Sequence, residues 1–314
     1  MKTKIESRRI NFFLLIAFGI TWSLAIAIDL TGGLSNLKPG TTAWFLLILA
    51  MFSPALAAVL TRWITKEGWK DTYLKVNFKQ NRRYWLLAWF GTPLLLLLGA
   101  GIYFLLFPHY FDSTYAAISK TLAQAAQRTG KPIPVSPQMF IVIQAIQAIL
   151  LAPILNGIAT LGEEFGWRAY LLQKFMPLGN RNATIIVGAI WGIWHWPFIY
   201  LGYEYGFGYQ GYPWLGMIVF LWFTFIIGTF LVWLTLSTDS IWPAVIAHSS
   251  LNGLAPLVLL LIKGQPNPLL GPSAVGLIAS IPFAILGLTL FLRSHIFSSA
   301  EISSKQSDAV QFGD

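Results

Sequence analysis

Eight apolar stretches, each close to 20 residues long, limit what this chain can fold into. They span roughly residues 10–30, 42–61, 84–107, 139–160, 183–203, 214–236, 241–262 and 274–292. A helix of about 20 apolar residues is long enough to cross the hydrocarbon core of a bilayer. Charged residues make up 11% of the chain, whereas an ordinary soluble domain has about 25%. We therefore predict an all-α fold, a polytopic membrane helix bundle with about eight transmembrane helices.

Two segments add to this pattern. The fourth apolar stretch continues as a more polar helix to about residue 173, so that we expect one long helix from residue 139. The sequence "TYAAISKTLAQAAQRTG", between the third and fourth stretches, predicts a short helix outside the membrane. The polar end of the chain, "SSAEISSKQSDAVQFGD", has the composition of a disordered tail.

Lysine and arginine are distributed unequally between the two sets of loops. With the N-terminus inside, the inner segments hold 15 of these residues and the outer segments hold five. The positive-inside rule then places both termini in the cytoplasm. We expect a multi-pass protein of the cell (plasma) membrane. Since the loops account for the net charge of +9, the basic composition predicts the lipid bilayer, and no nucleic acid, as a partner.

Five ionisable side chains remain inside the predicted spans: Glu163, Glu164, Arg168, His195 and His248. A charge at the bilayer centre costs roughly 2.5–3.5 kcal/mol, so these groups should meet each other or water. With a rise of about 1.5 Å per residue, the two histidines and Glu163 lie roughly 10–18 Å from the inner ends of their helices. Three helices thus carry polar groups to one depth.

The spacing along the acidic helix separates its two carboxylates. Glu164 and Arg168 are four residues apart and share a helix face, which predicts an ion pair. Glu163 is rotated by about 100° from Glu164 and can point toward the histidine helices. The other two helices show the same spacing, with Trp191 four residues before His195 and Asn252 four residues after His248.

In this order, the residues form three motifs: Glu163-Glu164-Phe-Gly-Trp-Arg168, Trp191-Gly-Ile-Trp-His195 and His248-Ser-Ser-Leu-Asn252. The set resembles the CPBP family of intramembrane endopeptidases, also called the Abi or CAAX-protease family, with its EExxxR, aromatic-xxx-His and HxxxN motifs. Trp191 stands where phenylalanine is usual. The resemblance covers about residues 145–258. It implies a CPBP/CAAX-protease-like catalytic core over 139–262, N-terminal membrane helices and loops over 1–138, and a last membrane helix with a disordered cytoplasmic tail over 263–314.

The resemblance also implies an activity and roles for these residues. The protein would hydrolyse peptide bonds of membrane-associated protein or peptide substrates, either of CAAX type or related to bacteriocins. Glu163 and His195 would activate a water, His248 and Asn252 would hold the oxyanion, and Glu164, Arg168 and Trp191 would support them. Peptide hydrolysis needs such a base and such donors.

Other readings of the same residues remain open. Two His and one Glu (Glu163, His195 and His248) could instead hold Zn²⁺, as the metalloprotease label often given to such proteins suggests. The sequence has no cysteine, and its histidines do not form an i, i+4 pair, so we favour a glutamate-activated water with no required cofactor. A proton-coupled membrane transporter could use the same set, although the ionisable residues lie only in one half of the chain. A non-catalytic membrane immunity or scaffold protein is a third possibility.

Overall fold

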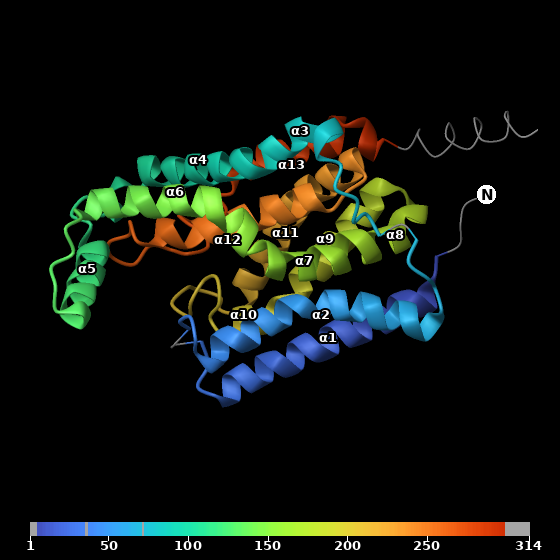
Figure 1. Cartoon of the computed structure of the whole chain (residues 1–314), viewed down its shortest axis with the longest axis horizontal. Coiled ribbons are helices and arrows are strands. Elements are labelled where there is room, and N and C mark those ends of the chain that lie inside the picture. The colour runs from blue at the N-terminus through green and yellow to red at the C-terminus, as the bar shows by residue number, and fades with distance from the viewer. Residues whose placement is uncertain (1–4, 35–36, 71, 299–314) are drawn as a thin grey trace, which may run out of the picture.

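The chain folds into helices that mostly lie along one long axis (Figure 1). We describe the fold from a computed structural model, in which residues 5–34, 37–70 and 72–298 are described. Regular structure within these ranges is helical, with no β-strand and one isolated bridge between Phe111 and Ile262. The all-α prediction is confirmed. The predicted tail lies almost entirely outside the described residues.

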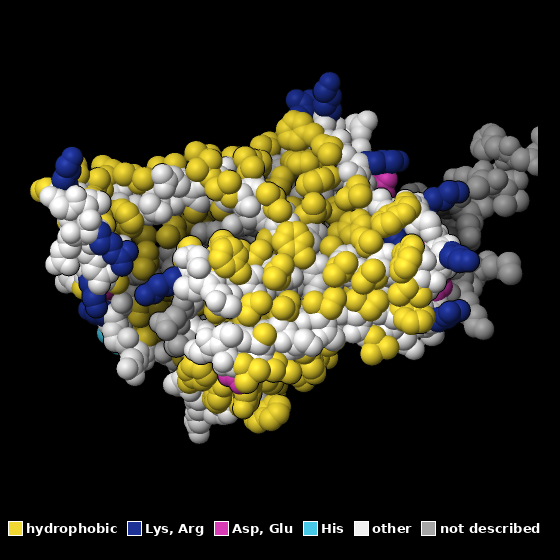
Figure 2. Space-filling view, turned by 60° about the horizontal axis from the view of Figure 1, so that its bottom comes forward, with side chains coloured by type: hydrophobic (Ala, Val, Ile, Leu, Met, Phe, Trp, Pro, Cys, Tyr) yellow, Lys and Arg dark blue, Asp and Glu magenta, His cyan; other side chains and the backbone are white. Residues whose placement is uncertain are grey.

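Five helices in the described ranges are long and apolar enough to cross a membrane. They are Ser7–Leu30 (α1), Thr42–Thr65 (α2), Phe78–Leu106 (α3, a π-helical turn and α4), Pro137–Leu155 (α6) and Trp214–Thr238 (α11). Figure 2 shows hydrophobic side chains across the middle of the bundle, with lysine and arginine gathered at its ends and along one edge. The chain is thus a multi-pass membrane protein built as a helix bundle.

The remaining predicted spans consist of shorter helices. The stretch 241–262 contains Trp242–Leu259 (α12), and the stretch 274–292 becomes helical only at Ile281, where α13 begins and runs to Arg293. The predicted short outer helix is confirmed as Ala116–Thr129 (α5). It lies at the end of the bundle opposite the N-terminus (Figure 1).

The prediction of one continuous helix from residue 139 to about 173 was wrong. The segment contains α6, then Gly157–Gly166 (α7), a π-helical turn at Trp167–Leu171, and Leu172–Phe175 (α8). Pro153 explains the end of α6 at Leu155, because proline has no N–H to offer the carbonyl four residues earlier. That carbonyl, of Ile149, instead accepts a hydrogen bond from Trp89 Nε1 at 2.8 Å.

The stretch 183–203 is also broken, at His195. Asn180–Trp194 (α9) ends there, and Trp196–Tyr200 (α10) follows. Pro197 again removes a backbone donor. The His195 N–H bonds the Gly192 carbonyl at 3.1 Å, three residues back, as in a tightened last turn. The break leaves His195 at the exact junction of two helices, instead of in the middle of one.

The helix α11 lies at the centre of the bundle. In its most apolar stretch 72% of the residues are buried, against 6% in that of α6. Helix α11 packs against α9, α12 and α13, while α1 and α2 lie together along the opposite side of the bundle from α4 and α13 (Figure 1). One hydrophobic core contains side chains from each of the three predicted parts of the chain (1–138, 139–262 and 263–314), among them Ile10, Trp167 and Phe283.

Small residues fix how the acidic helix is rotated. Gly162 and Gly166 of α7 face α2, and a Cβ on Gly166 would lie 2.3 Å from Pro54 Cβ. Such close approach of two helices requires glycine. Since this face of α7 is occupied by α2, the carboxylates of Glu163 and Glu164 are directed toward the other helices.

Candidate active site

The three motifs meet inside the bundle. Six of their seven selected residues form one set linked by hydrogen bonds and ring contacts: Glu163, Glu164, Arg168, Trp191, His195 and His248. They come from α7, the π-helical turn after it, the end of α9, and α12. Asn252 lies apart from this set.

Glu164 contacts both Arg168 and His248. Its Oε1 accepts hydrogen bonds from Arg168 at 2.9 Å and from His248 Nδ1 at 2.9 Å. Glu164 is 0% and Arg168 1% exposed. The ion pair with Arg168 is the one that the i, i+4 spacing predicts. The bond to His248 was not predicted, because it depends on how α12 is rotated against α7.

A neighbouring contact holds those two helices in register. Thr160 and Ser249 share a buried hydrogen bond of 2.6 Å between their hydroxyl oxygens. Thr160 lies one turn before Glu164, and Ser249 follows His248 directly. This contact therefore places the imidazole beside the carboxylate. Its signal in the sequence is weak, since hydroxyl residues are common in membrane helices.

Glu163 points away from this pair, as its 100° rotation predicts. Its Oε2 accepts a hydrogen bond from Trp191 Nε1 at 2.8 Å, within the buried interior. The Trp191 ring also lies under the Arg168 guanidinium, 4.3 Å from its centroid. The Trp191 N–H thus fixes the position of one carboxylate oxygen of Glu163.

His195 is held in one tautomer. Its Nδ1 lies 2.8 Å from the Trp191 carbonyl oxygen. A carbonyl can only accept, so Nδ1 carries the proton and the neutral ring keeps its lone pair on Nε2. The ring is packed against Trp194 at 4.6 Å and Phe220 at 4.7 Å between centroids.

The orientation of Trp194 depends on the N-terminal helices. Its indole N–H donates to Thr21 Oγ1 of α1 at 2.6 Å, and Thr21 also bonds Ser53 of α2. Sequence reasoning missed Thr21, Ser53 and Phe220. The two hydroxyl residues lie within largely apolar helices, which is a weak signal because each helix also carries other hydroxyl residues.

His248 has a different environment from His195. Because its Nδ1 donates to a carboxylate, its Nε2 can also donate only when the imidazole is protonated. The partner of His248 Nδ1 is a carboxylate, whereas the partner of His195 Nδ1 is a backbone carbonyl.

Asn252 is placed one helical turn beyond His248. It is exposed, and its side chain makes no hydrogen bond within the described part of the chain. The shared face of His248 and Asn252 leads from the buried set to the surface of the bundle. A group entering from that side would meet the amide first.

The side chains do not converge as metal ligands. Among the residues that the structure describes, no group of three His, Cys, Asp or Glu side chains could hold a metal ion. In this arrangement the side chains of Glu163, His195 and His248 are therefore not grouped as the ligands of a zinc site.

The interior of this helical membrane bundle thus holds the Glu163 carboxylate, two oriented imidazoles and the buried Glu164–Arg168 ion pair. The model of the type II CAAX prenyl endopeptidase Rce1-like family matches residues 139–254, which contain all three motifs. Residues 139–254 therefore carry a domain of the CPBP family of intramembrane proteases. No curated protein matches the chain. The family match supports a CAAX-type intramembrane endopeptidase.

Proposed function

We propose that this protein hydrolyses peptide bonds of membrane-associated proteins or peptides, using a water activated by Glu163 and His195. The observation that carries the proposal is the convergence of the motif residues, with Glu163 and His195 both held by Trp191. The Trp191 indole N–H donates to the Glu163 carboxylate, and the Trp191 carbonyl oxygen accepts from His195 Nδ1. One residue therefore sets the positions of both proton acceptors.

The chemistry follows from these groups. The water oxygen attacks the peptide carbonyl carbon, and Glu163 or His195 takes up the proton. His248 Nε2–H and the Asn252 amide donate to the carbonyl oxygen as it becomes negative. The stored proton then passes to the amide nitrogen when the C–N bond breaks. Glu164 with Arg168 keeps His248 in place.

The substrates that we propose are chains anchored in or on the membrane, either of CAAX type or related to bacteriocins. Quantitative proteomics of membrane peptide termini, comparing cells that produce the protein with cells that produce Glu163→Ala, should reveal new termini only with the active protein. The same cleavage, repeated with purified protein and one identified peptide in lipid vesicles, should persist in chelator. Chelation that removes activity and zinc that restores it would contradict the water mechanism. Equal sets of termini in both cells would contradict the protease assignment.

We also propose that both termini are cytoplasmic and that the protein is in the plasma membrane. The N-terminus, the end of α2, α8 and the end of α13 lie at one end of the bundle and α5 lies at the other (Figure 1), which agrees with the grouping that the basic residues suggest. Reporters fused after residue 38 and after residue 75 should be external and cytoplasmic respectively. An external reporter at residue 75 would overturn this orientation.

A further inference from the structure

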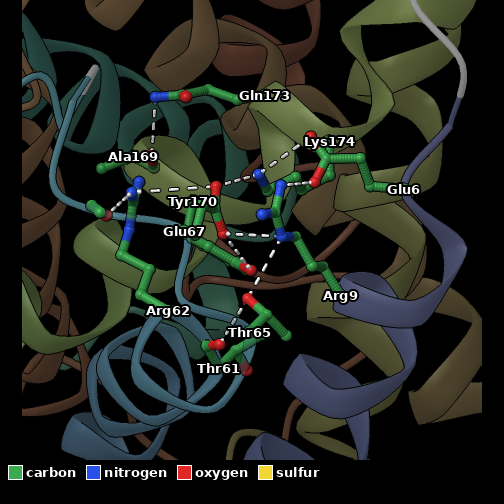
Figure 3. Close-up of polar contacts among 11 residues, drawn as sticks. Glu6, Arg9, Thr61, Arg62, Thr65, Glu67, Ala169, Tyr170, Gln173 and Lys174 are labelled. Atoms are coloured by element: carbon green, nitrogen blue, oxygen red, sulfur yellow. Dashed lines mark hydrogen bonds and ion pairs between the residues drawn. The ribbon is translucent and has the colours of Figure 1, made fainter.

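A second cluster of charged residues lies at the end of the bundle that carries the N-terminus (Figure 3). It joins the start of α1, the end of α2 and the helical segment that follows the acidic motif. Its members are Glu6, Arg9, Arg62, Glu67, Tyr170 and Lys174. Four of them precede residue 139, so they lie outside the family match.

Glu67 is the carboxylate that all other parts of this cluster share. Its Oε2 accepts a hydrogen bond from the Tyr170 hydroxyl at 3.1 Å and lies 3.5 Å from Arg9 Nε. Its Oε1 pairs with Lys174 and lies 3.8 Å from Arg62. The side chain is brought there by a left-handed residue, Lys66 (φ 52°), at the end of α2. One carboxylate thus ties α1 and α2 to the segment that carries Tyr170 and Lys174.

The cluster has fewer carboxylates than cations. Three cations share two carboxylates, and the second carboxylate, Glu6, is 41% exposed, whereas Glu67 is 11% exposed. Arg62 and Lys174 are 4% and 7% exposed. Loss of the Glu67 charge would leave these buried cations with one partly solvated carboxylate, and like charges would push the segments apart.

Tyr170 connects the cluster to the candidate active site. It lies two residues after Arg168, in the π-helical turn Trp167–Leu171. Its ring stacks on Phe13 of α1 at 5.2 Å and lies 5.1 Å from both the Arg62 and the Lys174 charged groups. A π turn is a rare insertion of one residue into an α-helix. If it relaxed to an α turn, the two sides of the helix would rotate against each other by about 100°.

We propose that Glu67 is a positioning residue for the candidate active site. By binding Tyr170 within the π turn and Lys174 just after it, Glu67 holds that turn and so keeps Arg168 and Glu164 directed at His248. The inference rests on the proposed function for its kinetic part. Its structural part, that Glu67 holds the π turn, stands on these contacts and is measured separately below.

The test compares Glu67→Gln with wild type in activity and in amide hydrogen exchange. The variant should lower kcat about 10- to 100-fold with KM unchanged, since small misplacements of reacting groups cost rates of this order. Exchange should become faster across residues 163–175 and stay unchanged in α11. Tyr170→Phe keeps the ring packing but removes the hydroxyl, so it should show the same pattern more weakly. The double variant should be no worse than Glu67→Gln, because both remove one contact.

Glu6→Gln is the matched control, since it removes a carboxylate of the same cluster that contacts Arg9 and Lys174 but not Tyr170, and so leaves the Glu67–Tyr170 and Glu67–Lys174 contacts in place. It should leave kcat and the exchange of residues 163–175 close to wild type. Equal losses in Glu6→Gln and Glu67→Gln would overturn the proposal, as would faster exchange over the whole bundle. If wild type cleaves nothing, the proposed function fails, yet local exchange in Glu67→Gln still decides whether Glu67 holds the turn.

Discussion

Glu163→Gln is expected to lower peptide hydrolysis by about 10²- to 10⁴-fold, the range that a positioned base contributes, while the bundle stays folded. The amide cannot accept a proton from water at neutral pH. Its oxygen can still accept the 2.8 Å hydrogen bond from Trp191 Nε1. Glu163 is buried and makes no ion pair with Arg168, whose partner is Glu164. Removing the Glu163 charge therefore costs no counterion.

The measurement pairs turnover of one membrane peptide with thermal unfolding in the same detergent or lipid. We expect the unfolding midpoint of Glu163→Gln to equal or exceed that of wild type, because a neutral amide is cheaper to bury than a carboxylate. Residual turnover near the wild-type level would show that Glu163 is not the base. A strongly lowered midpoint would show instead that the carboxylate is structural.

A substitution of His195 extends this experiment. Its Nε2 is the other proton acceptor, and its Nδ1 is held by the Trp191 carbonyl. If the two groups act on one water, the Glu163→Gln and His195→Gln losses should be far from additive, as for residues that act as a unit. Independent, additive losses would separate their roles.

The sequence predicts which residues form this site better than it predicts the contacts between them. Polar residues in apolar helices are costly, so Glu163, Glu164, Arg168, His195 and His248 could be selected without a structure. Local spacing was also enough for the Glu164–Arg168 pair, because both residues lie on one helix. The catalytic roles of these residues remain proposals.

Contacts between helices could not be predicted in the same way. The Glu164–His248 and Glu163–Trp191 hydrogen bonds depend on helix rotation, which the glycine face of α7 against α2 and the Thr160–Ser249 contact establish. Nothing local to one helix encodes such rotations. For the same reason, the role of Glu67 could not be read from the loop in which it lies.

The helix breaks show a different limit. Hydropathy along the sequence reports only the length of an apolar stretch, so it predicts single continuous helices over 139–173 and 183–203. Pro153 and Pro197 were visible, but proline inside a membrane helix is often tolerated, because neighbours can satisfy the freed carbonyl. Trp89 does satisfy the carbonyl of Ile149, and the chain nevertheless ends α6 at Leu155.

Glu164→Gln is expected to behave in the opposite way to Glu163→Gln, although the two residues are adjacent and chemically identical. Glu164 is 0% exposed and accepts from both Arg168 and His248. The amide would leave the guanidinium buried without its counterion, and breaking such a pair costs about 3–5 kcal/mol. We therefore expect a clearly lower unfolding midpoint.

Activity should fall as well, for a separate reason. A glutamine can present either its oxygen or its NH₂ group to His248 Nδ1, so it no longer fixes which ring nitrogen carries the proton. The loss of an oxyanion donor costs on the order of 10²- to 10³-fold in kcat. The part of the protein that remains folded should show this loss with KM nearly unchanged, because the donor acts in the transition state.

A second substitution separates the two effects. In Glu164→Gln with Arg168→Gln, no unpaired guanidinium remains, so most of the lost stability should return. Turnover should not return, since His248 still lacks its carboxylate. Unfolding midpoints and kcat, measured for the wild type, both single variants and the double variant, form a complete cycle. A double variant that regains activity together with stability would mean that Glu164 serves only as the counterion of Arg168 and that His248 needs no carboxylate to act.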